Sequence, residues 1–281
     1  MLSAAAAGAA ALVALAVLWE TGTSIVHVVV WPPAAAALVF WVLMRQAVRR
    51  HRVGVRTFGP RWRRTLDGHV TYYVALDGVE RRRFEREVAI FLDQAEITGV
   101  RTSVSDAVRL LVASSAVMLT FGRPGWTWPD LPEILIYPTP FDEDFRRASR
   151  HVAYAGMVVP RNAIALSKSA LIWSFRHDEP YHVGLHEFAH VLDMEDGRFD
   201  GVPRGLPSAA QRRWQALIGD ELVRVRTGQS VLDEYAGLNE AETFAVAVEY
   251  FFRAPQRLRR QHPELYEALR AYLNQDPAGS D

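Results

Sequence analysis

The sequence predicts an α+β fold, mainly helical with a small sheet, preceded by an N-terminal transmembrane helical hairpin. Three observations lead to this prediction. Two long apolar runs occupy the first 44 residues, segments with helical spacing of apolar residues predominate after about residue 65, and only short runs are rich in strand-forming residues. Because the expected helices outnumber the expected strands, a mixed domain with a small sheet is the class that fits.

The amino-acid composition limits the kinds of function and of metal site that this protein can have. The chain has 281 residues, of which 49% are hydrophobic and 23% charged, a balance typical of a globular protein. Its 32 basic and 32 acidic residues give a formal net charge of zero, so no nucleic-acid partner is indicated. Cysteine is absent. A bound metal would therefore have to be held by histidine and carboxylate side chains.

The first 44 residues have the length and composition of two membrane spans. Residues 2–19 carry no charge and would extend roughly 27 Å as a helix, close to the thickness of a hydrocarbon core. Residues 25–44 are also apolar, although Pro32 and Pro33 interrupt them and imply a kink. The simplest interpretation is a hairpin of two spans joined by a short polar turn.

Arginines follow the second apolar run and indicate an orientation. Between Arg45 and Arg64 there are eight arginines and no acidic residue, a pattern typical of the cytoplasmic side of a membrane. We expect residues 1–52 to be a lipid-contacting anchor in the inner membrane, with residues 65–281 forming a domain that faces the cytoplasm. Two alternatives are a signal peptide in the first run, although no basic residue precedes it, and a second run that lies in the membrane interface.

Four segments outline the domain before its most informative motif. Residues 78–99 and 103–122 place apolar side chains at near-helical spacing and are expected to form helices. Residues 133–138 and 162–168 include short runs favourable for strands. The second of these strands is expected to offer a free edge to an extended peptide.

The motif is His186-Glu187-Phe188-Ala189-His190. Histidines four residues apart leave the same face of a helix, and this HExxH pattern is typical of zinc peptidases. Glu187 points about 100° away from His186, so it is poorly placed as a ligand but can reach a water on the metal. The apolar neighbours predict a buried helix, where ionisable groups are costly unless coordinated or paired. The alternative is a chance match with two packed histidines.

A catalytic zinc takes a third protein ligand, and several carboxylates compete for that position. Asp196 follows His190 by six residues, but it lacks the preceding glycine that would turn the chain back toward the metal. Asp193 stays on the histidine face and is better suited to orienting a ligand. Glu242 and Glu249 share one face of a later helix, and either fits a gluzincin-like site. Asn239 and Glu242 also have the spacing of a capping box, which needs no metal.

Three stretches resemble the Mlc titration factor A family of zinc metallopeptidases: residues 133–145, 185–204 and 233–277. In that family the ligand glutamate opens an A-E-x-F-A-V run and follows a functional tyrosine by seven positions. The resemblance therefore implies that Glu242 is the third ligand and that Tyr235 is catalytic. Glu249, like Asp193, then becomes a candidate for orienting a ligand. The fold implied is a gluzincin-like metallopeptidase domain.

The function implied is hydrolysis of a peptide or protein substrate by metal-activated water. His186, His190 and Glu242 would hold one Zn²⁺, Glu187 would act as general base, and Tyr235 would donate a hydrogen bond to the oxyanion. The alternative is a membrane-tethered binding module that sequesters a transcriptional regulator, with peptidase activity secondary or absent. The resemblance suggests such a regulator as a partner. The apolar N-terminus departs from the soluble members of the family.

Overall fold

A computed structural model describes residues 58–126, 128, 131, 133–140, 156–159, 163–194, 199–203 and 205–279, together with 37–41, 48–49 and 52–53. The chain divides into two compact units, Met1–Val55 and Arg56–Asp281. Most of the predicted anchor, residues 1–52, lies outside the described residues. Among the helices that are described, none is both long and apolar enough to cross a membrane. The anchor therefore stays a prediction.

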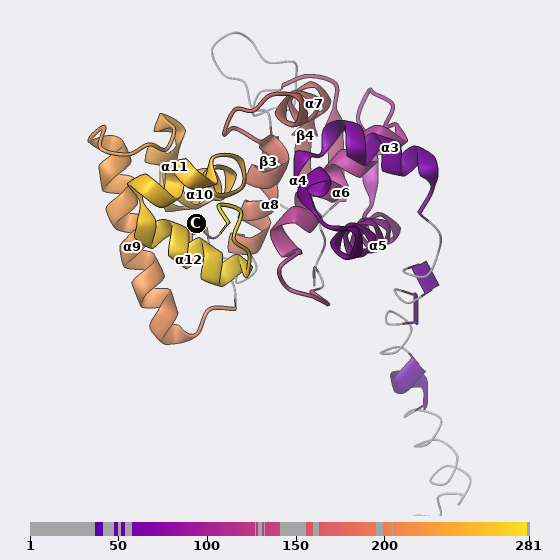
Figure 1. Cartoon of the computed structure of the whole chain (residues 1–281), viewed down its shortest axis with the longest axis horizontal. Helices are drawn as coiled ribbons and strands as arrows, with labels where there is room; N and C mark the ends of the chain where they lie inside the picture. Colours follow the sequence, from indigo (N-terminus) through magenta and orange to yellow (C-terminus); the bar gives the residue numbers. More distant parts are fainter. Residues whose placement is uncertain are drawn as a thin grey trace, which may run out of the picture. The chain divides into compact units, whose positions relative to one another are not determined.

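The unit Arg56–Asp281 is mainly helical with one small sheet, which confirms the α+β class (Figure 1). In chain order its elements are α3 Pro60–His69, α4 Thr71–Ala75, α5 Gly78–Gln94, β1 Ile97–Gly99, α6 Asp106–Thr120, β2 Glu133–Tyr137, β3 Gly156–Val159, β4 Ala163–Ser167, α7 Lys168–Arg176, α8 Val183–Met194, α9 Ser208–Arg226, the 3-10 helix η1 Glu234–Gly237, α10 Glu240–Arg253, α11 Pro255–Gln261 and α12 Pro263–Leu273.

The sheet has four described strands in the order β1-β2-β4-β3. The first three are parallel, and β3 runs antiparallel to β4. The predicted strands near residues 133–138 and 162–168 are present as β2 and β4. The expected free edge at 162–168 is wrong, because Ile164 of β4 is paired with Ile134 on one side and with Val158 on the other. The edge strand next to β4 is β3, which contacts α8.

The two helices expected early in the domain are α5 and α6, and local capping explains where they begin. Asp77 closes a capping box at the start of α5, in which its carboxylate accepts from the Val79 and Glu80 amides. Ser105 caps α6 by accepting from the Val108 amide. The apolar pattern of residues 78–99 ends as a helix at Gln94, because the segment from Ile97 pairs with β2 as strand β1.

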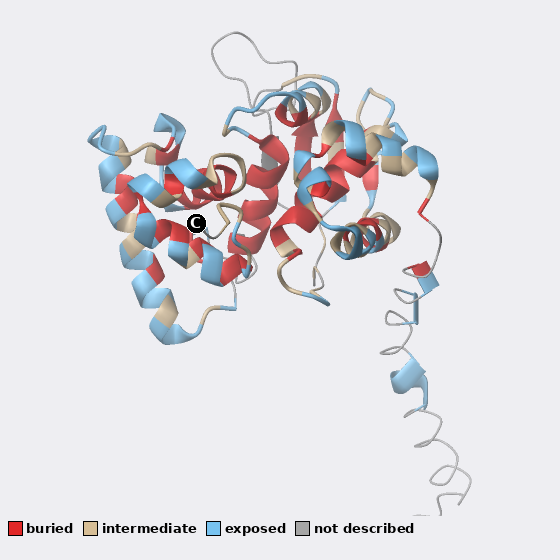
Figure 2. Cartoon of the chain, in the orientation of Figure 1, coloured by how far each residue is buried: buried red, intermediate tan, exposed pale blue. Residues whose placement is uncertain are grey.

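Helix α8, which carries the HExxH motif, is the buried centre of the unit (Figure 2). In Figure 1 it lies between α3–α6 with the sheet on one side and α9–α12 on the other. Phe188 is fully buried and meets Phe91 of α5 edge to face at 5.7 Å between ring centroids. A Cβ atom at Gly184 would lie 2.2 Å from the Ser115 Oγ on α6. Glycine at this position therefore lets α8 approach α6 closely.

Candidate metal centre

A buried histidine starts the helix that carries the motif. His182 immediately precedes α8, and its Nδ1 atom accepts a hydrogen bond of 3.2 Å from the Leu185 amide. Burial, followed by the charge of Arg253, lowers the pKa of His182 to about 3, so the ring is neutral and can accept. The helix begins at Val183, directly after this histidine. The role of His182 was not predicted from the sequence, although His182, His186 and His190 recur at intervals of four residues.

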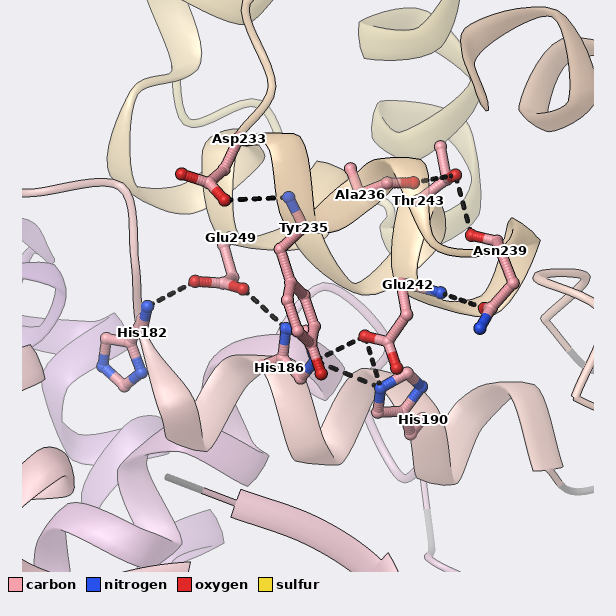
Figure 3. Close-up of polar contacts among 10 residues, drawn as sticks. All are labelled: His182, His186, His190, Asp233, Tyr235, Ala236, Asn239, Glu242, Thr243 and Glu249. Atoms are coloured by element: carbon pink, nitrogen blue, oxygen red, sulfur yellow. Dashed lines mark hydrogen bonds and ion pairs between the residues drawn. The ribbon is translucent and has the colours of Figure 1, made fainter. Parts of the chain in front are cut away.

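Asn239 caps the helix that carries the candidate third ligand. The Asn239 Oδ1 atom accepts a hydrogen bond of 2.9 Å from the Glu242 amide at the start of α10. The Glu242 carboxylate does not turn back toward this cap. It lies instead against the imidazoles of His186 and His190 on α8, the helix packed beside α10 (Figure 3).

Three side-chain atoms converge between α8 and α10. The Nε2 atom of His186 lies 3.0 Å from the Oε2 atom of Glu242 and 3.1 Å from the Nε2 atom of His190. The third side of this triangle, from His190 Nε2 to Glu242 Oε2, measures 3.4 Å. Donor atoms bound tetrahedrally to zinc at its usual bond lengths are about 3.3 Å apart. The sides of the triangle are close to this spacing.

Glu249 fixes which nitrogen of His186 faces the triangle. Its Oε1 atom lies 2.6 Å from the Nδ1 atom of His186, and both side chains are buried. Because a carboxylate can only accept, the Nδ1 atom carries a proton toward Glu249, and Nε2 is the nitrogen left to face the triangle. There the Nε2 atom of His186 meets the Glu242 carboxylate and the Nε2 atom of His190. Such a meeting of electron-pair donors is favourable only when a positive charge lies among them.

The pKa shifts also favour a positive charge among these groups. Burial opposes a charge on His186, but hydrogen bonds to Glu242 and Glu249 outweigh it and raise the pKa of His186 well above its usual value. Burial would raise the pKa of Glu242, yet the hydrogen bonds from His186 and His190 lower it to about 2. In the described part of the chain, the ion pairs of Glu242 and Glu249 are with histidines, and none is with an arginine or a lysine.

Glu187 lies beside the triangle without belonging to it. It is buried, and its Oε2 atom has no hydrogen-bond partner among the described residues. Burial is the main reason that the pKa of Glu187 rises to about 8, and the charges of Glu242 and Glu249 raise it further. A buried carboxyl oxygen without a protein partner, next to candidate ligands, is suited to a water molecule.

The remaining candidates differ in their relation to the triangle. Tyr235 on η1 places its ring 5.8 Å from the His186 ring, and Figure 3 shows its phenol extending toward the ligands. It is 41% exposed, so it is not an ordinary core tyrosine. Asp193 is fully buried; burial raises its pKa to about 6, although the Gly201 amide and nearby His190 favour its charged form. Asp196 lies outside the described residues.

The sequence comparisons agree with a metal centre. Residues 44–274 match the family model described as glucose-regulated metallo-peptidase M90. The chain belongs to this family. It is 30% identical to an uncharacterised protein of Synechocystis sp., over 82% of this chain and 89% of that protein. It is 29% identical to the Mlc titration factor A of Yersinia enterocolitica and 30% identical to that of Salmonella agona, over 77% and 73% of this chain and 85% and 83% of the relatives.

In this M90 chain two exposed aromatic residues near the triangle were not indicated by any motif. The Phe199 ring is 6.4 Å from the His190 ring and its side chain is 54% exposed. The loop that carries it passes close to α10, since a Cβ atom at Gly201 would lie 2.4 Å from the Glu240 carbonyl oxygen. Tyr181, beside α8, is 40% exposed. Phe199 is therefore available to a bound peptide near the candidate ligands, whereas the Tyr181 ring packs against Trp173 at 5.9 Å between ring centroids.

Proposed function

We propose that this M90 chain is a zinc-dependent peptidase in which His186, His190 and Glu242 hold one Zn²⁺ ion. The observation that carries the proposal is the triangle of three electron-pair donors, with sides of 3.0, 3.1 and 3.4 Å. Two imidazoles and one carboxylate are a known ligand set of catalytic zinc, which keeps a fourth position for water or substrate. When bound, zinc would polarise the peptide carbonyl and acidify a water molecule.

Glu187 is the proposed general base. Its carboxylate takes the proton of the attacking water and passes it to the leaving amine. Its burial and its unpartnered Oε2 atom among the described residues support this role. The phenol of Tyr235 is proposed to donate a hydrogen bond to the oxyanion that develops on the substrate carbonyl.

Two buried carboxylates are proposed to orient the ligands. Glu249 holds the His186 ring through Nδ1, an arrangement that fixes the tautomer and raises the basicity of the ligand nitrogen. Asp193, one turn beyond His190 and fully buried, is proposed to act on His190. Neither residue would contact the substrate.

The location of the enzyme is proposed from sequence. The two apolar runs within residues 1–52 and the arginines that follow them support an anchor in the inner membrane, with the peptidase unit on the cytoplasmic side. The substrate is then a peptide or protein at that face of the membrane.

A second candidate function is binding and sequestration of a transcriptional regulator. It is favoured by the printed name of the relatives, Mlc titration factor A. The buried Glu187 beside the triangle supports hydrolysis instead, since a site that only holds a metal needs no general base. The two functions can also reside in one protein.

A Glu187→Gln variant separates these proposals. The purified chain should hydrolyse members of a mixed peptide library, and a chelator should stop the reaction. Glu187→Gln should keep its zinc and lose activity by about 10³-fold, within the usual contribution of general acid–base catalysis. Glu240→Gln, which makes the same change at an exposed residue of α10, is the control and should remain active. A zinc-loaded wild-type chain that hydrolyses nothing would favour the binding function.

A further inference from the structure

Tyr235 is carried by a very short element. The 3-10 helix η1 spans only Glu234–Gly237, and isolated turns of this kind have weaker hydrogen-bond geometry than an α-helix. At its start the Oδ1 atom of the preceding residue, Asp233, accepts from the Tyr235 amide at 3.0 Å. A catalytic phenol on such a turn needs support from outside the turn if its position is to be fixed.

The first external support comes from the helix that carries the candidate ligand. The hydroxyl of Thr243 donates a hydrogen bond of 2.7 Å to the Ala236 carbonyl oxygen and has the Asn239 carbonyl of its own helix as a second acceptor at 3.0 Å; Thr243 is fully buried (Figure 3). Thr243 follows Glu242 directly on α10. Thr243, the neighbour of the candidate ligand Glu242, therefore holds Ala236, the neighbour of Tyr235.

The second external support comes from the end of α9. The guanidinium of Arg226 donates to the Gly237 carbonyl at 2.8 Å and to the Leu238 carbonyl at 3.0 Å. Three consecutive carbonyl groups, those of Ala236, Gly237 and Leu238, thus accept hydrogen bonds from side chains of two other helices. This is more than the turn needs merely to close, because Leu238 also donates its own amide to the Tyr235 carbonyl.

We infer that Thr243 and Arg226 are positioning residues that hold η1 so that the Tyr235 phenol stays directed at the metal-binding triangle. The inference rests on the proposed role of Tyr235 and extends it. Because Thr243 and Glu242 are neighbours on α10, one rigid helix sets the distance between the candidate ligand and the phenol. Neither positioning residue touches the substrate. Their effect is on the transition state, through Tyr235.

The matched pair Thr243→Val and Thr243→Ser tests the inference. Valine keeps the shape of threonine and removes the hydroxyl, whereas serine keeps the hydroxyl. Because a shift of about 1 Å in a catalytic group can cost up to 10²-fold in rate, Thr243→Val should lower kcat about tenfold. KM and zinc content should be unchanged, and Thr243→Ser should restore most of kcat. Arg226→Met, an exposed change that spares the core, should lower kcat in the same direction.

The decisive readout is the combination with Tyr235→Phe. If Thr243 acts through the phenol, Thr243→Val should cause no further loss of kcat once the phenol hydroxyl is gone. An equal loss in both backgrounds, a loss of zinc in Thr243→Val, or full kcat in Thr243→Val and Arg226→Met would each overturn the inference. A large loss in Tyr235→Phe beside full kcat in Thr243→Val removes this inference alone. Full kcat in Tyr235→Phe removes the proposed role of Tyr235 as well.

Discussion

His186 and Glu249 form a buried hydrogen bond of 2.6 Å between the Nδ1 atom of the imidazole and the Oε1 atom of the carboxylate. The other oxygen of Glu249 accepts from the backbone amide of His182, at the point where α8 begins. One carboxylate on α10 therefore fixes both a candidate ligand and the start of the helix that carries it. This contact explains how α8 and α10, which are far apart in sequence, hold the three donor atoms close together.

Replacing Glu249 with glutamine should weaken zinc binding by about 10- to 100-fold, the usual effect of removing the hydrogen-bond partner of a ligand histidine. The glutamine side chain can donate as well as accept, so it does not require a proton on Nδ1 of His186. It also lacks the negative charge of the carboxylate. Competition with a chromogenic chelator measures the affinity. Glu240→Gln on the exposed N-terminal turn of α10 should leave it unchanged. Equal zinc affinity in Glu249→Gln and wild type would show that the contact does not tune the ligand.

Gly184→Ala should lower the free energy of unfolding by about 1–3 kcal/mol, the cost of overpacking a close interior contact. The added Cβ atom would lie 2.2 Å from the Oγ and 2.7 Å from the Cβ of Ser115. Ser115→Gly in the same chain should recover part of the loss. Gly219→Ala on α9, where a Cβ meets nothing within 4 Å, should be neutral or stabilising by up to about 1 kcal/mol. Urea unfolding measures all four chains, and a Gly184→Ala chain as stable as wild type contradicts the packing account.

The buried pair of Glu221 on α9 and His262 before α12 should make stability depend on pH. Their side chains lie 2.9 Å apart, and the Ser230 hydroxyl also donates to Glu221. Burial alone would raise the pKa of Glu221, but the hydrogen bonds from His262 and Ser230 lower it below its usual 4.5. A carboxyl whose pKa is lower in the folded state contributes stability above its unfolded pKa, and this contribution disappears as the pH falls through the folded pKa.

Glu221→Gln should therefore lower the free energy of unfolding by about 3 kcal/mol near neutral pH, as expected when one partner of a buried pair is removed. The difference from wild type should shrink as the pH is lowered below 4.5, the usual pKa of the group. Urea unfolding at a series of pH values checks this. A difference that stays constant down to acidic pH would mean that the Glu221 charge contributes nothing.

The proposed anchor predicts the behaviour of the whole chain in cells. The complete chain should sediment with membranes and resist extraction by alkaline carbonate, whereas residues 53–281 alone should be released. A protease added to intact spheroplasts should not reach a tag at the C-terminus, because the peptidase unit is proposed to face the cytoplasm. Release of the complete chain by carbonate would contradict an anchor of two spans. Digestion of the tag would contradict the orientation.

Features that depend on nearby residues could be predicted from the sequence. The spacing within His186 and His190 fixes a shared helix face whatever the tertiary structure, and Asn239 caps α10 as its residue type suggests. The same holds for β2 and β4, whose strand-forming runs are short and clear. Local propensity and packing agree in these elements, so the pattern alone was sufficient.

Features that depend on long-range packing could not be predicted from the sequence. Glu242 and Glu249 lie two turns apart on one face of α10, so spacing fits either as the third ligand. Their different partners follow from how α10 lies along α8. The strand order of the sheet is likewise a tertiary property, which is why the free edge expected at β4 was wrong. The support of η1 by Arg226 and Thr243 has no pattern in the sequence at all.

Zinc content of purified variants tests the central claim most directly. The wild-type chain should hold about one zinc per chain, as expected for a mononuclear site. Glu242→Ala should lose it on dialysis against a weak chelator, and Glu249→Gln should still bind it at saturating zinc. Full zinc in Glu242→Ala, or loss of all binding in Glu249→Gln but not in Glu242→Ala, would contradict the proposed ligand set.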